Sequence, residues 1–212
     1  MATVLSINPL FPDPEAIEQA VRVVQRGGLI IYPTDTVYGL GTNALDSKAV
    51  LRVFAAKHRP PGQPLPVAVK GACMANELAV ITPNAQRLIE AFWPGALTIV
   101  LERRGIVPDA TTGGRREVAL RAPDHRVPLQ IMENSGLPLI ATSANIHGKP
   151  SSLTAEEAMS QLGDEVGLVL DGGNATGRPS TILDITTMPP KVLRPGSVTK
   201  EEIMLILGSD VS

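Results

Sequence analysis

The sequence is poor in the residues that build disulfide frameworks, metal centres and stacking surfaces for bases. Its 212 residues include one cysteine, Cys73, which excludes an internal disulfide and a cysteine-rich metal site. Its three histidines, His58, His125 and His147, lack the spacing of a metal-binding pair. Six residues are aromatic, too few for an extended platform on which nucleic-acid bases stack. These shortages argue against a metalloprotein and against a protein that binds single strands by stacking.

The sequence also lacks an excess of charge and a long hydrophobic run. Nineteen Lys and Arg stand against 21 Asp and Glu, a net charge of −2, which argues against a protein that coats nucleic acid but leaves room for a local basic groove. No apolar run approaches the roughly 20 residues that a membrane-spanning helix needs. The first residues do not have the pattern of a secretory signal. We therefore expect a cytoplasmic protein without membrane contact.

What is present is the composition of a folded α/β protein. Apolar residues make up 43% of the chain, enough for a core and too many for a disordered chain. Helix and strand patterns alternate throughout, and no repeat or long linker divides them. We predict a single domain over residues 1–212, with a core of about residues 10–208. Its fold class is an α/β, twisted, open, mixed sheet flanked by helices.

Capping residues and apolar spacing indicate where these elements lie. Helix starts are predicted at Asp13, Asp46 and Thr82, and at two capping boxes, residues 154–157 and 199–202. A further helix is expected over 127–135. Strands are expected at 28–32, 65–69, 96–101, 117–122, 139–142, 168–170, 181–185 and 192–193. Ligands of α/β folds bind at the carboxyl ends of strands, so chemistry is sought there.

Several common motifs are absent or weak. Lys149 after Gly148 is followed by proline, so there is no Walker A loop, and no G-x-S-x-G elbow of a serine hydrolase occurs. Residues 39–44 match the form G-x-G-x-x-A of a dinucleotide fingerprint, but five residues separate them from the strand and no acidic residue follows about 20 positions later. A nucleotide would therefore have to be held mainly by side chains.

Polar and cationic residues instead gather after the predicted strands. Thr and Ser hydroxyls follow the strands that end near residues 32 and 141, and Ser180 precedes another strand. Cations at these places are Lys57, Arg59, Arg121 and Arg194. Arg binds phosphate or carboxylate with two hydrogen bonds, so this set favours an anionic ligand.

Seven of these segments resemble, in order, the motifs of the YrdC family of threonylcarbamoyl-AMP synthases. The segments are YPTDTVYGLG (32–41), KHRPPGQPL (57–65), WPGALT (93–98), VALRAPDH (118–125), TSANIHGKPS (142–151), STILD (180–184) and LRPGS (193–197). They extend over nearly the whole chain, and together they are far more specific than any one alone. The resemblance is to the single-domain form of the family. It implies a YrdC-like fold with a concave, cationic face.

The resemblance implies a nucleotidyltransferase that forms L-threonylcarbamoyladenylate from L-threonine, bicarbonate and ATP and releases pyrophosphate. Mg²⁺ would accompany ATP. The product would serve a downstream threonylcarbamoyl-transferase complex that modifies position 37 of tRNA, and a weak contact with tRNA itself fits the family. No protein nucleophile is needed, because the carbamate of threonine attacks the α-phosphorus.

The resemblance also assigns roles to individual residues. Those expected to hold threonine are Thr36, Arg121, Ala141 and Ser180, with Arg121 on the carboxylate. Those expected to hold the nucleotide are Arg59, Gln63, Ser143, Asn145, Ser151 and Arg194. Lys57 and Arg59 are the expected catalytic cations, with Lys57 facing phosphate, and residues 61–63 are a candidate lid.

Three positions differ from the longer relatives. Gln63 stands where they often have Asn, Ala68 where they often have His, and Glu117 where they often have Thr. Ala68 removes a contact to threonine or bicarbonate, and Glu117 would place a carboxylate near ATP unless it points away.

Two other functions also fit part of this pattern. The basic loops would suit a module that binds structured RNA without catalysis. A carbamoyl-adenylate-forming transfer domain would share the adenylate chemistry but start from carbamoyl phosphate.

Overall fold

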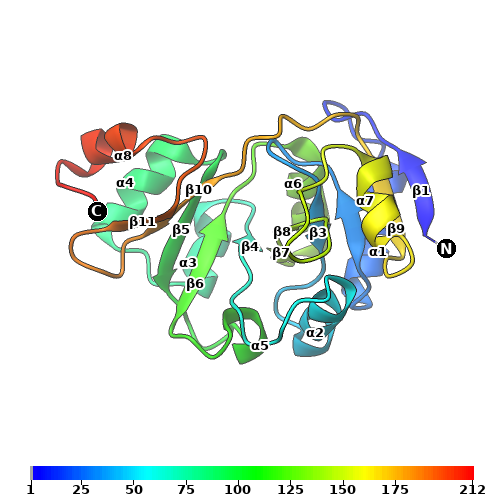
Figure 1. The fold of residues 1–212 in the computed structure, drawn as a ribbon, viewed down its shortest axis with the longest axis horizontal. Coiled ribbons are helices and arrows are strands. Elements are labelled where there is room, and N and C mark those ends of the chain that lie inside the picture. The colour runs from blue at the N-terminus through cyan, green and yellow to red at the C-terminus, as the bar shows by residue number, and fades with distance from the viewer. Residues whose placement is uncertain (1) are drawn as a thin grey trace.

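The computed structural model describes residues 2–212, which form eight helices and eleven strands interspersed along the chain (Figure 1). The helices are α1 (Pro14–Gln25), α2 (Ser47–Ala56), α3 (Ala72–Leu78), α4 (Pro83–Phe92), α5 (Asp109–Thr112), α6 (Arg126–Ser135), α7 (Ala155–Leu162) and α8 (Lys200–Leu207). The strands are β1 (Thr3–Ser6), β2 (Ile30–Tyr32), β3 (Gly39–Gly41), β4 (Val67–Ala68), β5 (Leu97–Glu102), β6 (Glu117–Arg121), β7 (Leu139–Ile140), β8 (Thr142–Ser143), β9 (Leu168–Asp171), β10 (Thr181–Asp184) and β11 (Lys191–Arg194). None of the helices in this described part has the length and apolar character needed to cross a membrane.

The strands form two mixed sheets. One has the order β1-β9-β2-β3-β8, with β9 parallel to both β1 and β2 and the remaining pairs antiparallel. The other has the order β11-β10-β5-β6-β4-β7, in which β10 is parallel to β5 and β4 is parallel to β6. The predicted mixed α/β class is confirmed, but the strands divide between two sheets, whereas a single open sheet was expected.

One segment joins the two sheets. Residues 139–143 contribute β7 to the larger sheet and β8 to the smaller one, so the chain passes from one sheet to the other within five residues. The amide of Ile140 also donates to the carbonyl of Thr42, directly after β3. In Figure 1 this junction lies between the two halves of the molecule, beside β4. Side chains that follow either sheet's strands can therefore meet near this junction.

Five of the eight helices begin where the capping residues predict, whereas α3 and α5 were not predicted. Asp13, Asp46 and Thr82 accept hydrogen bonds from the first-turn amides of α1, α2 and α4. Thr199 and Glu202 form the expected capping box at α8. At α7 the box is altered: Thr154 caps Glu157, but the Glu157 carboxylate accepts from the amide of Leu153 instead. The helix start is correct there, although its second hydrogen bond is displaced by one residue.

The glycines of the G-x-G-x-x-A match have a packing role. Gly39 and Gly41 belong to β3, which pairs antiparallel with β2 and does not open a helix. A Cβ atom on Gly39 would lie 2.9 Å from the ring of Tyr32, and one on Gly41 would lie 2.6 Å from it. The two glycines thus let β3 pass closely under a buried tyrosine, and the dinucleotide interpretation is rightly rejected.

Candidate functional site

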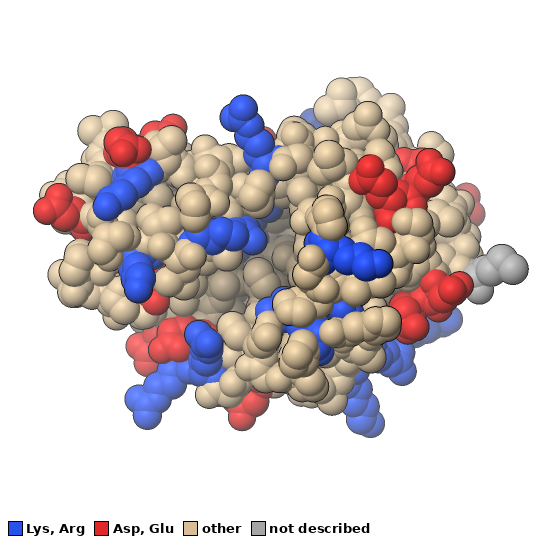
Figure 2. Space-filling model, in the orientation of Figure 1, with Lys and Arg blue, Asp and Glu red and all other residues tan. Residues whose placement is uncertain are grey.

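A pocket of about 290 Å³ lies where the strand ends of the two sheets meet. It is lined from both halves of the molecule by residues as far apart in the chain as Tyr32 and Arg194. Figure 2 shows the surface hollowed between the two halves, with Lys and Arg side chains around the hollow. Such a concave site with a few convergent polar groups is where a small ligand is expected to bind.

Eight of the eleven predicted site residues line this pocket. They are Thr36, Arg59, Arg121, Ala141, Ser143, Ser151, Ser180 and Arg194. Lys57, Gln63 and Asn145 do not line it. Seven of the eight come from six of the seven motifs that carry the family resemblance, and Ala141 directly precedes one of these motifs. Long-range folding therefore brings together residues that the sequence could relate only by their motifs.

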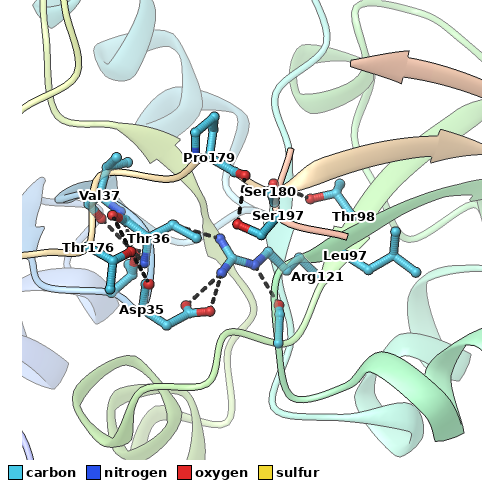
Figure 3. Close-up of polar contacts among 12 residues, drawn as sticks. Asp35, Thr36, Val37, Leu97, Thr98, Arg121, Thr176, Pro179, Ser180 and Ser197 are labelled. Carbon is cyan, nitrogen blue, oxygen red and sulfur yellow. Dashed lines mark hydrogen bonds and ion pairs between the residues drawn. The ribbon is translucent and has the colours of Figure 1, made fainter. Parts of the chain in front are cut away.

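Arg121, at the end of β6, is held on three sides (Figure 3). Its Nη2 lies 2.6 Å from both carboxylate oxygens of Asp35, its Nη1 donates to Thr36 Oγ1 at 3.0 Å, and its Nε donates to Gly95 O at 2.8 Å. The side chains of Arg121 and Asp35 are 11% and 17% exposed. The guanidinium is thus fixed in direction, with a carboxylate already beside it.

The loop after β2 presents Thr36 to the pocket. The hydroxyl of Thr34 accepts from the amides of Thr36 and Val37 and donates to Val37 O, which folds residues 34–37 into a compact turn. The hydroxyl of Thr176 donates to Asp35 O at 2.9 Å, and the amide of Gly177 donates to Thr36 O. The segment before β10 therefore braces this turn from the other side.

Ser180 links the two groups of residues that were assigned to threonine and to the nucleotide. Its hydroxyl lies 2.9 Å from Thr98 Oγ1 on β5 and accepts from Arg194 Nη2 at 3.0 Å. Arg194 also donates to the Ser180 carbonyl. Burial lowers the pKa of Arg194, and the nearby positive charge of Arg121 lowers it further. Both guanidinium groups line the pocket, so they can contact one anionic ligand region.

Arg59 follows α2 and reaches the pocket from the opposite side. Its Nη2 donates to Pro64 O at 3.0 Å, and its Nε is buried without a hydrogen-bond partner in the described structure. Burial lowers its pKa. A buried donor without a partner costs free energy unless a ligand supplies an acceptor. Arg59 is therefore well suited to receive an oxygen of a bound anion.

Lys57 does not line the pocket. Its position therefore differs from the one expected of a residue that faces phosphate. The side chain is 2% exposed, and its Nζ donates to the carbonyls of Ser143 and Asn145. Burial and, secondarily, the charge of Arg59 lower the pKa of Lys57 to about 8. The N–H groups of Lys57 that were expected to bind phosphate donate instead to backbone carbonyls at the end of β8 and in the loop after it. Lys57 thus fixes the loop that carries Ser143.

Asn145 completes that loop without lining the pocket. Its Nδ2 donates to Ile146 O and to Lys149 O, both at 2.8 Å. These hydrogen bonds order the chain around Ser143, which is a different role from the direct contact with the nucleotide expected of Asn145. Ser151 follows the same loop and does line the pocket.

The three positions that differ from the longer relatives have different surroundings. Ala68 lines the pocket, so alanine in place of the histidine that longer relatives often have leaves more space in the site. Glu117 is not among the lining residues and lies at the opposite end of β6 from Arg121. Gln63 is half-buried in the loop after Arg59, also outside the lining. The concern about a carboxylate in the nucleotide region is therefore removed.

Several residues in and around the site were not singled out from the sequence, among them Thr98, which lines the pocket, and Asp35, which contacts Arg121. Asp35 and Thr98 lie inside quoted motifs, but neither was assigned a role, because their partners Arg121 and Ser180 are 86 and 82 residues away. Asp35 could have been noticed because it is an acidic residue between two threonines directly after a strand. Within residues 2–212 no group of three or more His, Cys, Asp or Glu side chains could hold a metal ion.

Three comparisons with known proteins give matches over most of the chain. The family model for Sua5, YciO and YrdC proteins, with the description "Telomere recombination", matches residues 22–196. The threonylcarbamoyl-AMP synthase of Pyrococcus abyssi is 42% identical over 194 residues, which cover 91% of this chain and 57% of that protein. A putative threonylcarbamoyl-AMP synthase of Mycobacterium tuberculosis is 40% identical over 206 residues, which cover 94% of each chain.

A solved structure is similarly close. The crystal structure of P. abyssi Sua5 complexed with L-threonine superposes with a TM-score of 0.95 at 38% identity, covering 100% of this chain and 63% of that one. The chain thus spans less than two thirds of the P. abyssi protein, and nearly the full length of the mycobacterial relative.

Proposed function

Because the chain belongs to the Sua5, YciO and YrdC family, we propose that it is an enzyme that forms L-threonylcarbamoyladenylate from L-threonine, bicarbonate and ATP. The observation that carries this proposal is the convergence of seven family-motif residues, together with Ala141, on one pocket. The resemblance of the fold to a Sua5 structure with L-threonine bound supports the choice of amino acid.

The reaction proceeds in two steps without a protein nucleophile. The amine of threonine attacks bicarbonate to give a carbamate and water. A carbamate oxygen then attacks the α-phosphorus of ATP, and the bond to the β-phosphate oxygen breaks to release pyrophosphate. Catalysis would come from positioning and from cations near the developing charge, which are the two effects that suffice for such transfers.

The residues divide the pocket into an amino-acid end and a nucleotide end. At the amino-acid end Arg121 would bind the carboxylate, with Thr36, Ser180 and the carbonyl of Ala141 as polar contacts; the amide of Ala141 already donates to Pro66 O. At the nucleotide end Arg59, Ser143 and Ser151 would bind phosphate or ribose oxygens. Arg194 lies at the boundary, bonded to Ser180.

Lys57 would act as a positioning residue for the nucleotide end. Its ammonium group fixes the carbonyls on either side of Ala144 and so sets the direction in which the Ser143 hydroxyl points. This replaces the direct contact with phosphate that the resemblance implied.

Mg²⁺ would enter with ATP. The residues near the pocket offer hydroxyls and guanidinium groups and no cluster of carboxylates, which suits an ion held by phosphates and water more than a dedicated protein site. Such an ion neutralises the charge of the departing pyrophosphate. Dependence of turnover on added Mg²⁺ at fixed ATP tests this.

The decisive experiment measures pyrophosphate release by the purified chain with ATP, Mg²⁺ and bicarbonate. Threonine should stimulate release, and serine, which lacks the methyl group, should be a poorer substrate. Release that ignores threonine, or that requires carbamoyl phosphate instead, would contradict the proposal. Arg87→Ala, on the exposed face of α4, is a suitable control for purification and folding.

A further inference from the structure

The ion pair between Asp35 and Arg121 is unlike the other ion pairs of the molecule. In the described chain the remaining three each include a carboxylate side chain that is at least 61% exposed. Asp35 is 17% exposed and places both of its oxygens on a single nitrogen of Arg121. An ion pair shielded from water interacts much more strongly than one at the surface. Arg121 lines the pocket and Asp35 does not, so Asp35 is a shielded negative charge directly beside a pocket residue and not a surface contact.

The hydrogen bonds of Arg121 limit what a ligand can gain from it. A guanidinium has five N–H groups. Nε is used by Gly95 O, the two hydrogens of Nη2 face Asp35, and one hydrogen of Nη1 faces Thr36 Oγ1. One N–H of Nη1 is left without a partner among residues 2–212. A ligand carboxylate that binds there must share one cation with a second carboxylate.

The other charges nearby do not remove this competition. Arg194 is close to Arg121, but it donates to Ser180 and belongs to the boundary with the nucleotide. Burial lowers the pKa of His125 in spite of the opposing charges of Asp35 and Asp124, so the site does not favour a positive charge on this ring. The local balance at the amino-acid end is therefore one guanidinium against one carboxylate before any ligand arrives.

We propose that Asp35 is a specificity-determining residue, which makes the amino-acid end select a zwitterionic α-amino acid over a carboxylate that lacks an amino group. This rests on the proposed function, in which Arg121 binds the substrate carboxylate. The ammonium group of the amino acid offsets the negative charge of Asp35, whereas a simple carboxylate brings a second negative charge with no compensation. The selection matters chemically, because a bound hydroxy acid has no amine to form the carbamate.

The test compares two ligands that differ in one group. L-Threonine and 3-hydroxybutyrate share the carboxylate, the carbon skeleton and the hydroxyl, and only threonine has the amine. Dissociation constants of both are measured by calorimetry on the full chain and on Asp35→Asn, which keeps the shape of the side chain and removes its charge. A charge a few ångströms away at an effective dielectric constant of about 20 changes binding by tenfold or more. We expect the ratio of the two dissociation constants to fall at least tenfold in Asp35→Asn.

Each result separates the inference from its alternatives. If Asp35 only held Arg121 in place, its loss would weaken both ligands alike, and an unchanged ratio would overturn the proposal. Asp35→Glu keeps the charge and should keep the ratio within about threefold, and a ratio as low as that of Asp35→Asn would also overturn it. Asp109→Asn, which breaks the exposed ion pair with Arg103, is the matched control and should leave the ratio unchanged.

The wild-type chain provides a test that does not depend on folding of a variant. It must bind 3-hydroxybutyrate at least tenfold more weakly than threonine, and equal affinities would overturn the inference. Failure of the wild-type chain to bind threonine at all is a different result, because it would contradict the proposed function itself.

Discussion

The amino-acid end and the nucleotide end of the pocket differ in how completely their polar groups are paired. At the first, Arg121 has partners on Nε, Nη1 and Nη2, and Ser180 is bonded to Thr98. At the second, Arg59 Nε is buried without a partner. The half-buried Ser143 and the exposed Ser151 line the pocket, and their hydroxyls form no hydrogen bond with another residue among 2–212. The polar groups of the amino-acid end are thus already held by protein partners, whereas the nucleotide end has donors that only a ligand can pair.

This difference has an energetic meaning for binding. Groups that are already held lose little conformational freedom when a ligand arrives, so they contribute orientation and selectivity. Unpaired donors gain whole hydrogen bonds, and bonds to charged groups contribute about 1.5–3 kcal/mol each. We therefore expect substitutions at the nucleotide end to have the larger effect on rate. Substitutions at the amino-acid end should mainly change the affinity for threonine.

The largest effect is expected for Arg59→Ala. It removes the cation whose Nε has no protein partner, and loss of such a group costs on the order of 2–4 kcal/mol of transition-state stabilisation. Initial rates of pyrophosphate release should show kcat/KM for ATP reduced about 30- to 1,000-fold, with the affinity for threonine nearly unchanged. Near-wild-type kinetics would show that Arg59 does not bind the nucleotide. The contrast between a paired amino-acid end and an unpaired nucleotide end would then be wrong.

The second effect is a dependence of stability on pH that comes from Lys57. Its pKa is lowered to about 8 in the folded chain, against an ordinary value near 10.5. Between these two values the unfolded chain binds more protons than the folded one, so stability rises with pH. Below pH 8 the group is charged in both states, and above pH 10.5 it is neutral in both.

This prediction is measured as a difference between wild type and Lys57→Met, so that other titrating groups cancel. Urea unfolding at pH 7.5 and 10.5 should show the stability advantage of the wild type growing by on the order of 2–3 kcal/mol. Lys191→Met, on exposed β11, should show no such change. A constant difference across this range would mean that the carbonyls of Ser143 and Asn145 keep the ammonium charged despite its burial.

Local sequence patterns predicted the helices and strands around this site better than the contacts between its side chains. The caps at Asp13, Asp46 and Thr82 act within three residues, so the sequence shows both donor and acceptor. Lys57 and Asp35 act on partners 86 or more residues away, so nothing local reveals which atoms they meet. Lys57 was expected to contact phosphate because a sequence motif gives the type and order of its residues. It does not show where each side chain points.

The pairing of two-residue strands was difficult to predict, for a related reason. The strand expected at 65–69 contains β4, and the one expected at 139–142 contains β7 and the first residue of β8. β4 and β8 are each two residues long, and their hydrogen-bond partners lie in β6, β7 and β3. Such strands are defined by their neighbours more than by their own composition. The passage of residues 139–143 from one sheet to the other, which brings the two groups of site residues together, therefore had no local signal.

A smaller effect is expected for Ser180→Ala, at the paired end. The change removes the hydroxyl that Thr98 and Arg194 share, while the bonds of Arg194 to the Ser180 carbonyl remain. Loss of one hydrogen bond costs about 1 kcal/mol, so the KM for threonine should rise about fivefold with little change in kcat. A large fall in kcat with an unchanged KM would show that Ser180 acts in the transition state, and the two ends would then not be separable.

The smallest effect is expected for Gln63→Ala. Gln63 lies outside the pocket lining, in a loop anchored where the amide of Leu65 donates to Thr111 O at 2.9 Å. A Cβ at Gly113, whose φ is +64°, would overlap the carbonyl of Gly62, so this loop also packs closely on residue 113. A loop held at two points should move little, and the KM for ATP should change less than threefold. A tenfold rise would instead show that residues 61–63 close over the nucleotide as the sequence suggested. The nucleotide end would then be completed by its ligand, which would sharpen its contrast with the prearranged amino-acid end.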